Sequence, residues 1–191
     1  MLEVTSGLSP QQTAQLAQLH VTCLPETAIG TLGRGYALRV YECLIQSPFE
    51  RIFLEQQDDR LIGAAVTSED SVGLFSRLRS QTSLMWHLLT GVPSRQRWRA
   101  FRTLTESGCP PQIVLDYPEL VFLYIGAAYR RRGIAHKLLV KSESSLRDSG
   151  NRHYFVRTRD HPSNQASRFY ASQGFTLDMV RDGIQYWIKP I

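Results

Sequence analysis

The sequence predicts an α/β fold organised around a mixed β-sheet. Three observations in one stretch of chain support this class. Residues 119–125 are almost continuously apolar, which is typical of a strand buried on both faces. Residues 133–148 place apolar side chains at helical spacing, and residues 152–158 alternate as in a second strand. A strand, a helix and a further strand in this order favour two parallel strands joined by a crossover helix.

Two helices are predicted before this unit. Ser9 and Gln12 fit a capping box, with a proline between them in the first turn, so a helix should begin here. Its apolar positions recur at helical spacing, with His20 among them as a core histidine. This helix should end at Leu24, because a proline follows. A second helix is predicted over residues 33–46.

Turn-forming residues separate the remaining predicted strands and the last helix. Segments 51–55 and 61–67 flank an acidic turn, which predicts a β-hairpin. Residues 163–173 again show helical spacing. Two short strands then flank Asp182-Gly183, because an Asp-Gly pair favours a tight hairpin turn.

Residues 69 to about 118 interrupt the sheet pattern and are predicted to form a helical insertion. Helical spacing occurs at 83–90 and again at 95–106. No Asp or Glu occurs between residues 71 and 105, whereas the whole chain has a net charge of +5. Two interpretations stay open: a positive field that attracts an anionic acceptor, and a solvated helical hairpin or dimer contact. The arginines of the segment are Arg77, Arg79, Arg95, Arg97, Arg99 and Arg102.

Length and composition restrict the class of protein. The chain has 191 residues, 42% hydrophobic and 20% charged, which fits one globular domain spanning residues 1–191 with an insertion. The longest apolar run is too short to cross a bilayer and the N-terminus has no signal-peptide pattern, so we expect a cytoplasmic protein without a transmembrane segment. The three cysteines form neither a zinc nor a disulfide pattern, so no metal is expected. The arginines are concentrated in one segment, and we therefore expect no nucleic acid partner.

The connection after the apolar strand has the order of an anion-binding loop. The apolar strand leads into Arg130, Arg131 and Arg132, then Gly133, then a helix. Free amides at a helix N-terminus point at a phosphate, and a glycine lets the backbone approach it. The segment is neither a P-loop nor a G-x-G-x-x-G fingerprint. From these residues alone, an anion site and a solvated surface turn both remain open.

This loop resembles the acetyl-CoA-binding motif of the GNAT superfamily of N-acetyltransferases. The family pattern is R/Q-x-x-G-x-G/A, and here Arg130, Gly133 and Ala135 occupy its fixed positions, with an aromatic residue at Tyr129. The proline that is common shortly after the family's strand is replaced by Ala127, at a structural position.

A second motif follows in the order that the family has. Residues 163–170 are similar to the family's N-x-x-A-x-x-[LF]-Y helix, and Gly174-Phe175 matches the strand start after it. The resemblance covers about residues 119–188 and is absent from the insertion. The helix asparagine falls on Ser163 in strict register, with Asn164 one residue later, and either residue is a candidate.

The resemblance implies a GNAT-like sheet, mixed and mostly antiparallel, whose central parallel strands splay apart to admit acetyl-CoA as acyl donor. The strand would align the pantetheine and polarise the thioester through a backbone amide, the amides of 131–136 would hold the pyrophosphate, and the arginine side chains would lie near the phosphates. The implied cofactor-binding residues are Leu123, Tyr124, Ile125, Arg130, Arg131, Arg132, Gly133, Ile134, Ala135, His136, Asn164 and Phe169.

Two residues match the family's catalytic positions. Glu119 begins the apolar strand and resembles the placement of the general-base glutamate, with an exposed carboxylate at the strand mouth as the alternative. Tyr170 matches the tyrosine near the sulfur that acts as general acid, with a packing aromatic as the alternative. Asp116 and His161 are weaker candidates for the base.

The hypothesis from the sequence is therefore acetyl transfer from acetyl-CoA to the primary amine of a small molecule. A nucleotide-linked amino sugar is one anionic acceptor that the arginine-rich segment suits. The alternatives are a catalytically silent acyl-CoA-binding or protein-interaction module and a protein N-acetyltransferase. The acceptor, the acyl chain length and the formation of a homodimer stay open.

Overall fold

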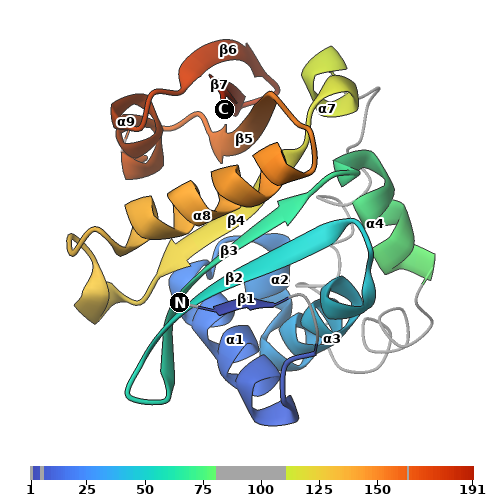
Figure 1. The fold of residues 1–191 in the computed structure, drawn as a ribbon, viewed down its shortest axis with the longest axis vertical. Coiled ribbons are helices and arrows are strands. Elements are labelled where there is room, and N and C mark those ends of the chain that lie inside the picture. The colour runs from blue at the N-terminus through green and yellow to red at the C-terminus, as the bar shows by residue number, and fades with distance from the viewer. Residues whose placement is uncertain (1, 5–6, 81–110, 163) are drawn as a thin grey trace.

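The computed structural model describes residues 2–4, 7–80, 111–162 and 164–191. Within these ranges seven strands form one sheet in the order β1-β2-β3-β4-β5-β7-β6, and only the β4–β5 pair is parallel (Figure 1). The strands are β1 (Leu2–Val4), β2 (Glu50–Gln57), β3 (Arg60–Ser68), β4 (Glu119–Ile125), β5 (His153–Arg159), β6 (Thr176–Arg181) and β7 (Ile184–Pro190). The predicted mixed, mostly antiparallel sheet is confirmed.

The N-terminal helices follow from their caps. α1 (Pro10–Cys23) begins after Ser9, whose side chain accepts from the amide of Gln12 while the Gln12 side chain accepts from the amide of Ser9, so the predicted capping box forms. α3 (Arg34–Gln46) occupies the second predicted helix. The short helix α2 (Ala28–Leu32) was not predicted, and the Thr27 side chain caps its N-terminus.

The two hairpins form where turn residues were expected. β2 and β3 pair antiparallel from Glu50–Ser68 to Gln57–Arg60, and Asp58 and Asp59 adopt the left-handed conformation in the turn between them. β6 and β7 pair around Asp182 and Gly183, which have φ angles of 52° and 73°. Both turns therefore use residues that tolerate positive φ.

The insertion is described only at its two ends. α4 (Ser71–Ser80) follows β3, and α7 (Gln112–Asp116) precedes β4. The helices expected at 83–90 and 95–106 lie outside the described residues. Arg77 of α4 forms ion pairs with Asp70 and with the buried Glu50, so this arginine docks its helix onto the start of β2.

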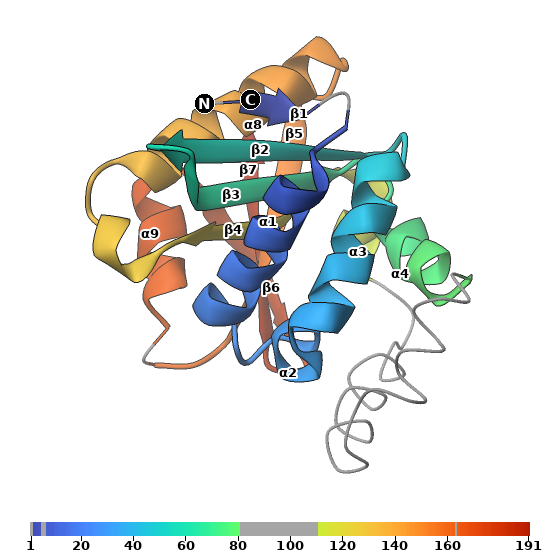
Figure 2. The same ribbon diagram turned by 90° about the horizontal axis from the view of Figure 1, so that it is seen from below.

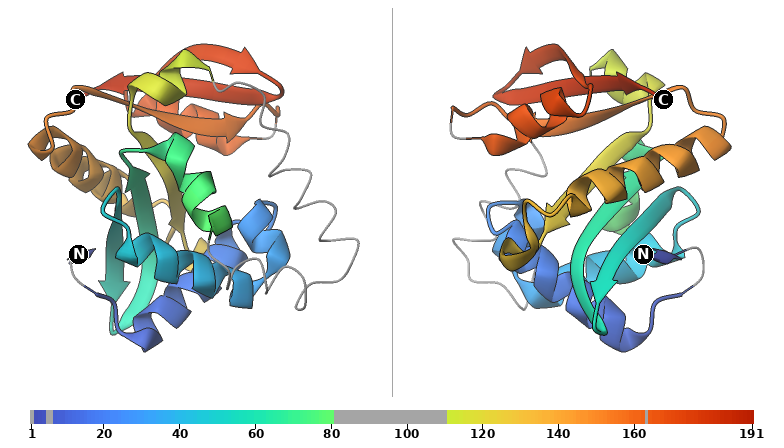
Figure 3. Two further views of the ribbon diagram at one scale, coloured as in Figure 1. Left: turned by 90° about the vertical axis from the view of Figure 1, so that its right-hand side faces the viewer. Right: turned by 60° about the vertical axis from the view of Figure 1, so that its left-hand side comes forward.

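The sheet divides at its parallel pair, as expected. β4 and β5 are joined by two register pairs, Glu119–Phe155 and Leu120–Val156, and diverge beyond them (Figure 3). β4 also contains one extra residue, because Val66 lies opposite Phe122 while Thr67 lies opposite Leu120. Val121 is therefore the extra residue of a β-bulge, which bends a strand and strengthens its twist.

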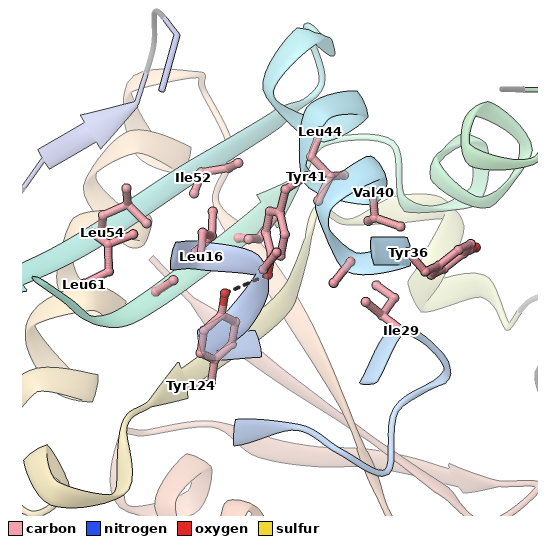
Figure 4. Packing of buried hydrophobic residues seen from close by; sticks show 14 of the residues in the cluster. Leu16, Ile29, Tyr36, Val40, Tyr41, Leu44, Ile52, Leu54, Leu61 and Tyr124 are labelled. Carbon is pink, nitrogen blue, oxygen red and sulfur yellow. Dashed lines mark hydrogen bonds between the residues drawn. The ribbon is translucent and has the colours of Figure 1, made fainter. Parts of the chain in front are cut away.

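Two hydrophobic layers cover the sheet on opposite faces. α1 and α3 lie together across one face, where Leu16, Val40 and Tyr41 pack against β2 and β3 (Figures 2 and 4). α8 (Ile134–Asp148) covers the other face, with Leu138 at 0% exposure. β4 packs against both cores, as predicted for a strand buried on both faces, and its middle three residues are half-buried.

Candidate active site

The connection from β4 to α8 is a wide turn with two left-handed residues. After β4 the chain makes a single 3-10 turn (η1, Ala127–Tyr129) and then passes through Arg131 at φ 61° and Gly133 at φ 74°. The Arg130 Nε donates to the carbonyl of Ile125 at 3.2 Å, which holds the loop against the end of the strand. A Cβ at Gly133 would meet no atom of the chain within 4 Å, so the backbone angle alone requires glycine in the protein itself.

Within the described residues, the first backbone amides of α8 have no hydrogen-bond partner and face this loop. Gly133 is its N-cap and supplies no side-chain cap, so the first amides of the helix stay available to an anion. His136 lies in this first turn and its Nδ1 is 2.6 Å from the Gln173 Oε1, which links the loop to the C-terminal end of α9 (Gln165–Ser172). Arg131 and Arg132 are exposed beside it. The loop therefore offers backbone amides and positive charge to an anionic group.

The strand edge leading to the loop is also open. Beyond Leu120, β4 pairs with β3 on one side and has no register partner in β5 on the other. Amides directed toward β5 are therefore free to pair with an extended ligand such as a pantetheine arm. Leu123 and Ile125 turn their side chains into the α8 core, whereas Tyr124 turns into the core under α1, so any contribution of these residues to ligand binding comes from the backbone.

The side chain of Asn164 makes three hydrogen bonds within the protein. It is the N-cap of α9, where its side-chain oxygen accepts from the amide of Ala166 at 2.9 Å. Its Nδ2 donates to the Thr158 Oγ1 at 2.5 Å and to the carbonyl of Arg159 at 2.6 Å. Both N–H groups of the amide are therefore occupied, and pantetheine could be bound only through the second lone pair of Oδ1 or by replacing one of these bonds. Ser163, the other candidate, lies outside the described residues.

Tyr170 of α9 packs into the core on the α8 side of the sheet, and its hydroxyl has no hydrogen-bond partner in the described part of the chain. The residue is 7% exposed, and its ring makes edge contacts with Phe169 and Phe175. Burial raises the pKa of its hydroxyl well above the usual value, so Tyr170 keeps its proton at neutral pH. The hydroxyl can therefore donate a hydrogen bond to a ligand atom, while the same burial makes it a weaker acid for full proton transfer.

Glu119 is buried and bound to an arginine. It is 2% exposed, and its two carboxylate oxygens each accept from Arg157, from Nε and from Nη2, at 2.7 Å. The alternative of an exposed carboxylate at the strand mouth is therefore wrong. The sequence did not single out Arg157, because the pair spans 38 positions and leaves no local pattern.

The two weaker candidates for the base are both exposed. Asp116 accepts a hydrogen bond from Gln112 of its own helix, α7, at 2.7 Å. His161 lies in the connection between β5 and α9.

A buried polar chain joins the α1–α2 connection to β4. The Thr27 hydroxyl donates to a backbone carbonyl at 2.8 Å, so it can only accept from the His20 Nε2 at 3.3 Å. His20 therefore carries its proton on Nε2, and its Nδ1 accepts from the Tyr41 hydroxyl at 2.8 Å. Tyr41 in turn accepts from the Tyr124 hydroxyl at 2.7 Å (Figure 4). The predicted core histidine is confirmed, and each of its polar atoms is paired.

A separate hollow of about 680 Å³ lies on the α1 side of the same loop. Its walls are the polar side of α1, the start of β3 and the residues after β4. Arg34 and Arg60 stand at its edge. This hollow is distinct from the divergence between β4 and β5. The candidate site is assigned to the divergence, because the backbone amides that could bind a ligand lie there and in the loop after β4.

The comparison with protein families decides the identity. Residues 15–175 match the model of the acetyltransferase (GNAT) family. The chain belongs to this family. A comparison with curated proteins found no match.

Solved structures of GNAT and related acetyltransferases share the fold of this GNAT protein. PaiA N-acetyltransferase from Thermoplasma acidophilum, in complex with coenzyme A, is 14% identical, with 100% of both chains covered and a TM-score of 0.62. Aminoglycoside 6'-acetyltransferase type Ii is 14% identical, with 100% of this chain and 97% of that chain covered and a TM-score of 0.62. The ribosomal-protein-S18-alanine N-acetyltransferase from Escherichia coli is 14% identical, with 100% and 94% covered and a TM-score of 0.58. At this identity the likeness shows the fold alone.

The family assignment gives the coarse chemistry of the GNAT site. The protein is an acyltransferase that uses acetyl-CoA as donor and an amine as acceptor. The described residues contain no cluster of metal-ligating side chains. None of the helices in the described ranges is long and apolar enough to span a bilayer.

Proposed function

We propose that the protein transfers an acetyl group from acetyl-CoA directly to the primary amine of a small molecule. The observation that carries this proposal is the β4–β5 divergence, which leaves an open strand edge leading into a loop of unpaired amides. These two features suit the extended arm and the diphosphate of one ligand. The arrangement also accounts for both sequence motifs, since one lies in the loop and the other in α9.

The residues of this chain have distinct parts in such a transfer. The amides of residues 131–136 would hold the pyrophosphate, with the charges of Arg131 and Arg132 nearby. A β4 amide beside the bulge at Val121 would donate to the thioester oxygen as it becomes negative, which is worth about 3 kcal/mol per donor. Tyr170 would return a proton to the departing thiolate.

The attacking amine must lose a proton, and the surroundings of Glu119 affect whether this residue can accept it. Glu119 remains a prediction for this role, but both of its oxygens are bound by Arg157. Each oxygen keeps a further lone pair that could take a proton, but the Glu119 side chain is only 3% exposed, so an amine has little access to it. The burial of Glu119 therefore favours a water-mediated route or a base contributed elsewhere.

The class of acceptor is the less constrained part of the proposal. Structural neighbours include an aminoglycoside acetyltransferase and an acetyltransferase of a ribosomal protein's alanine, so the fold serves both small-molecule and protein acceptors. The suggestion that the arginine-rich insertion attracts an anionic acceptor needs one correction: Arg77 is engaged by Glu50 and Asp70 and does not take part. Of the other arginines in this segment, Arg79 belongs to α4, whereas Arg95, Arg97, Arg99 and Arg102 lie outside the described residues.

The experiment is release of free thiol from acetyl-CoA with a panel of amines that includes amino sugars, polyamines, amino acids and peptides. Tyr170→Phe should lower kcat by about a hundredfold, the usual scale for a proton-transfer group, with little change in the affinity for acetyl-CoA. Tyr36→Phe, a buried tyrosine of α3, is the matched control and should keep its turnover. Equal turnover of Tyr170→Phe would assign Tyr170 to packing. Binding of acetyl-CoA without thiol release for any amine would favour a silent acyl-CoA module.

A further inference from the structure

The two parts of the sheet meet at a narrow junction. Strands β1 to β4 form one part and β5, β7 and β6 the other (Figure 1). Their only register pairs are Glu119–Phe155 and Leu120–Val156, and the amide of Phe155 also donates to the carbonyl of Pro118 at 3.0 Å. With so few backbone hydrogen bonds between β4 and β5, the sheet itself does little to fix the angle between its two parts.

Arg157 adds a side-chain link across this junction. It follows the last paired residue of β5 by one position and binds both oxygens of Glu119 on β4. It lies opposite Tyr186 of β7, which supplies a further side-chain hydrogen bond. One guanidinium therefore connects three neighbouring strands, β4, β5 and β7, at the apex of the divergence.

The link between Arg157 and Glu119 is largely buried, and this burial favours one fixed geometry. The side chains of Arg157 and Glu119 are 28% and 3% exposed, and Tyr186 is 8% exposed. Burial works to lower the pKa of Arg157, but the charge and hydrogen bonds of Glu119 outweigh it and raise the pKa above its usual value. A planar guanidinium that binds a carboxylate through two parallel bonds fixes orientation as well as distance.

A second arginine on the same strand gives the contrast. Arg159 pairs with Glu26 at 3.5 Å, and the two side chains are 63% and 82% exposed. The Arg159 Nη2 also donates to the backbone carbonyl of Glu26 at 2.9 Å, but an ion pair this exposed is screened by water and contributes little. Both arginines belong to β5, so the two pairs differ in burial and geometry. The Arg157–Glu119 pair is buried and bidentate, whereas the Arg159–Glu26 pair is exposed and has a longer distance between its charged atoms.

We propose that Arg157, anchored by Glu119, is a positioning residue that fixes the angle at which β4 and β5 diverge and thereby the position of the acyl end of the bound donor. This inference rests on the proposed function, because it assumes that the divergence receives acetyl-CoA. The bulge at Val121 comes directly after the junction, so a change in the strand angle moves the amides beside it first. In this arrangement Glu119 serves as the anchor of Arg157 and does not accept the proton of the amine.

The test compares three variants with one control. Arg157→Met and Glu119→Gln each weaken the link, and the double variant E119L/R157M removes both charges, which avoids leaving one charge buried without its partner. Arg159→Met is the matched control on the same strand. Hydrogen exchange of the ligand-free proteins, followed in peptides covering 119–125 and 153–159, reports the junction directly and does not depend on activity.

Exchange in both peptides should rise about tenfold in the three link variants and stay at the wild-type rate in Arg159→Met. The value of kcat should fall by about tenfold to a hundredfold, because a small misplacement of the reacting group is enough. Calorimetric affinity for coenzyme A, which lacks the acyl group, should stay within about twofold, since the phosphate loop is untouched. The double variant should be no worse than either single variant.

Unchanged exchange in the link variants would overturn the proposal, whatever their activity. A large loss of kcat in Glu119→Gln alone, with loss of the acidic limb of the pH profile, would instead identify Glu119 as the general base. If wild-type protein neither binds coenzyme A nor releases thiol, the proposed function fails, while the exchange result still decides whether Arg157 holds the junction.

Discussion

Acid should destabilise the protein through His20, because this residue is buried as a neutral imidazole. Among the described histidines only His20 is buried, at 0% exposure. Its Nδ1 accepts from Tyr41 and its Nε2 donates to Thr27, so a second proton would break the bond to Tyr41 and place a charge in the core. Burial lowers the pKa of His20 from 6.5 to about 4.

The size of the effect follows from this difference. The unfolded chain takes up a proton on His20 below about pH 6.5, whereas the native protein does so only near pH 4. Between about pH 6.5 and pH 4 the unfolded state binds more protons than the native state. The stability that neutral His20 contributes is therefore fully present above about pH 6.5 and is lost as the pH falls toward 4. At about 1.4 kcal/mol per pH unit the whole contribution is about 3 kcal/mol, of which about 2 kcal/mol is lost between about pH 7 and pH 5.

The assay is urea unfolding of wild type and His20→Gln at a series of pH values in that range. Glutamine cannot take up a proton, so the stability difference between the two proteins should shrink by about 2 kcal/mol on acidification. His153→Gln, an exposed histidine on β5, is the control and should follow the wild-type curve. Parallel curves for wild type and His20→Gln would refute the reasoning, because the two proteins would then bind the same number of protons on unfolding.

Three further predictions concern single structural features. Glu119→Gln and Arg157→Met should each lower the free energy of unfolding by about 3–5 kcal/mol, because each leaves one charge of a buried pair without its partner. E119L/R157M should stay near wild type, and additive losses in urea unfolding would show that the two residues do not act as a pair. Asn164→Ala should cost about 1–2 kcal/mol, measured in the same way, since it removes the cap of α9, and an unaltered midpoint would argue that the cap contributes nothing. Gly133→Ala should weaken calorimetric binding of coenzyme A because φ is 74°, whereas Gly150→Ala, with φ 83° away from the loop, should cost similar stability but leave binding unchanged. Equal affinities for these two glycine variants would remove the loop from the site.

The features that could be predicted from the sequence depend on residues that lie close together in the chain. Ser9 and Gln12 cap α1 through atoms three positions apart, and a proline ends the same helix, so a short window contains the whole interaction. The same holds for the loop at Gly133 and for the turn at Asp182-Gly183. The short helix α2 was missed because five residues carry too little periodicity to indicate a helix.

The features that could not be predicted join residues far apart in the chain. His20 meets Tyr41 and Tyr41 meets Tyr124 across 21 and 83 positions, and neither spacing has any meaning until α1, α3 and β4 pack together. The bulge at Val121 depends on the register with β3, which a single strand does not reveal. The cap that Asn164 forms on α9 was likewise not predicted, and a ligand contact by Ser163 or Asn164 stays a prediction.

By itself the sequence determined the class of sheet, the order of the two motifs and the loop that suits a diphosphate, because each depends on local spacing and backbone preference. Only the tertiary structure decided the state of Glu119. Its position at the start of β4 is the same whether its carboxylate faces water or an arginine. What determines its chemistry is that folding brings Arg157 to both of its oxygens and removes water from around them, and burial of this kind is a property of the packed sheet alone.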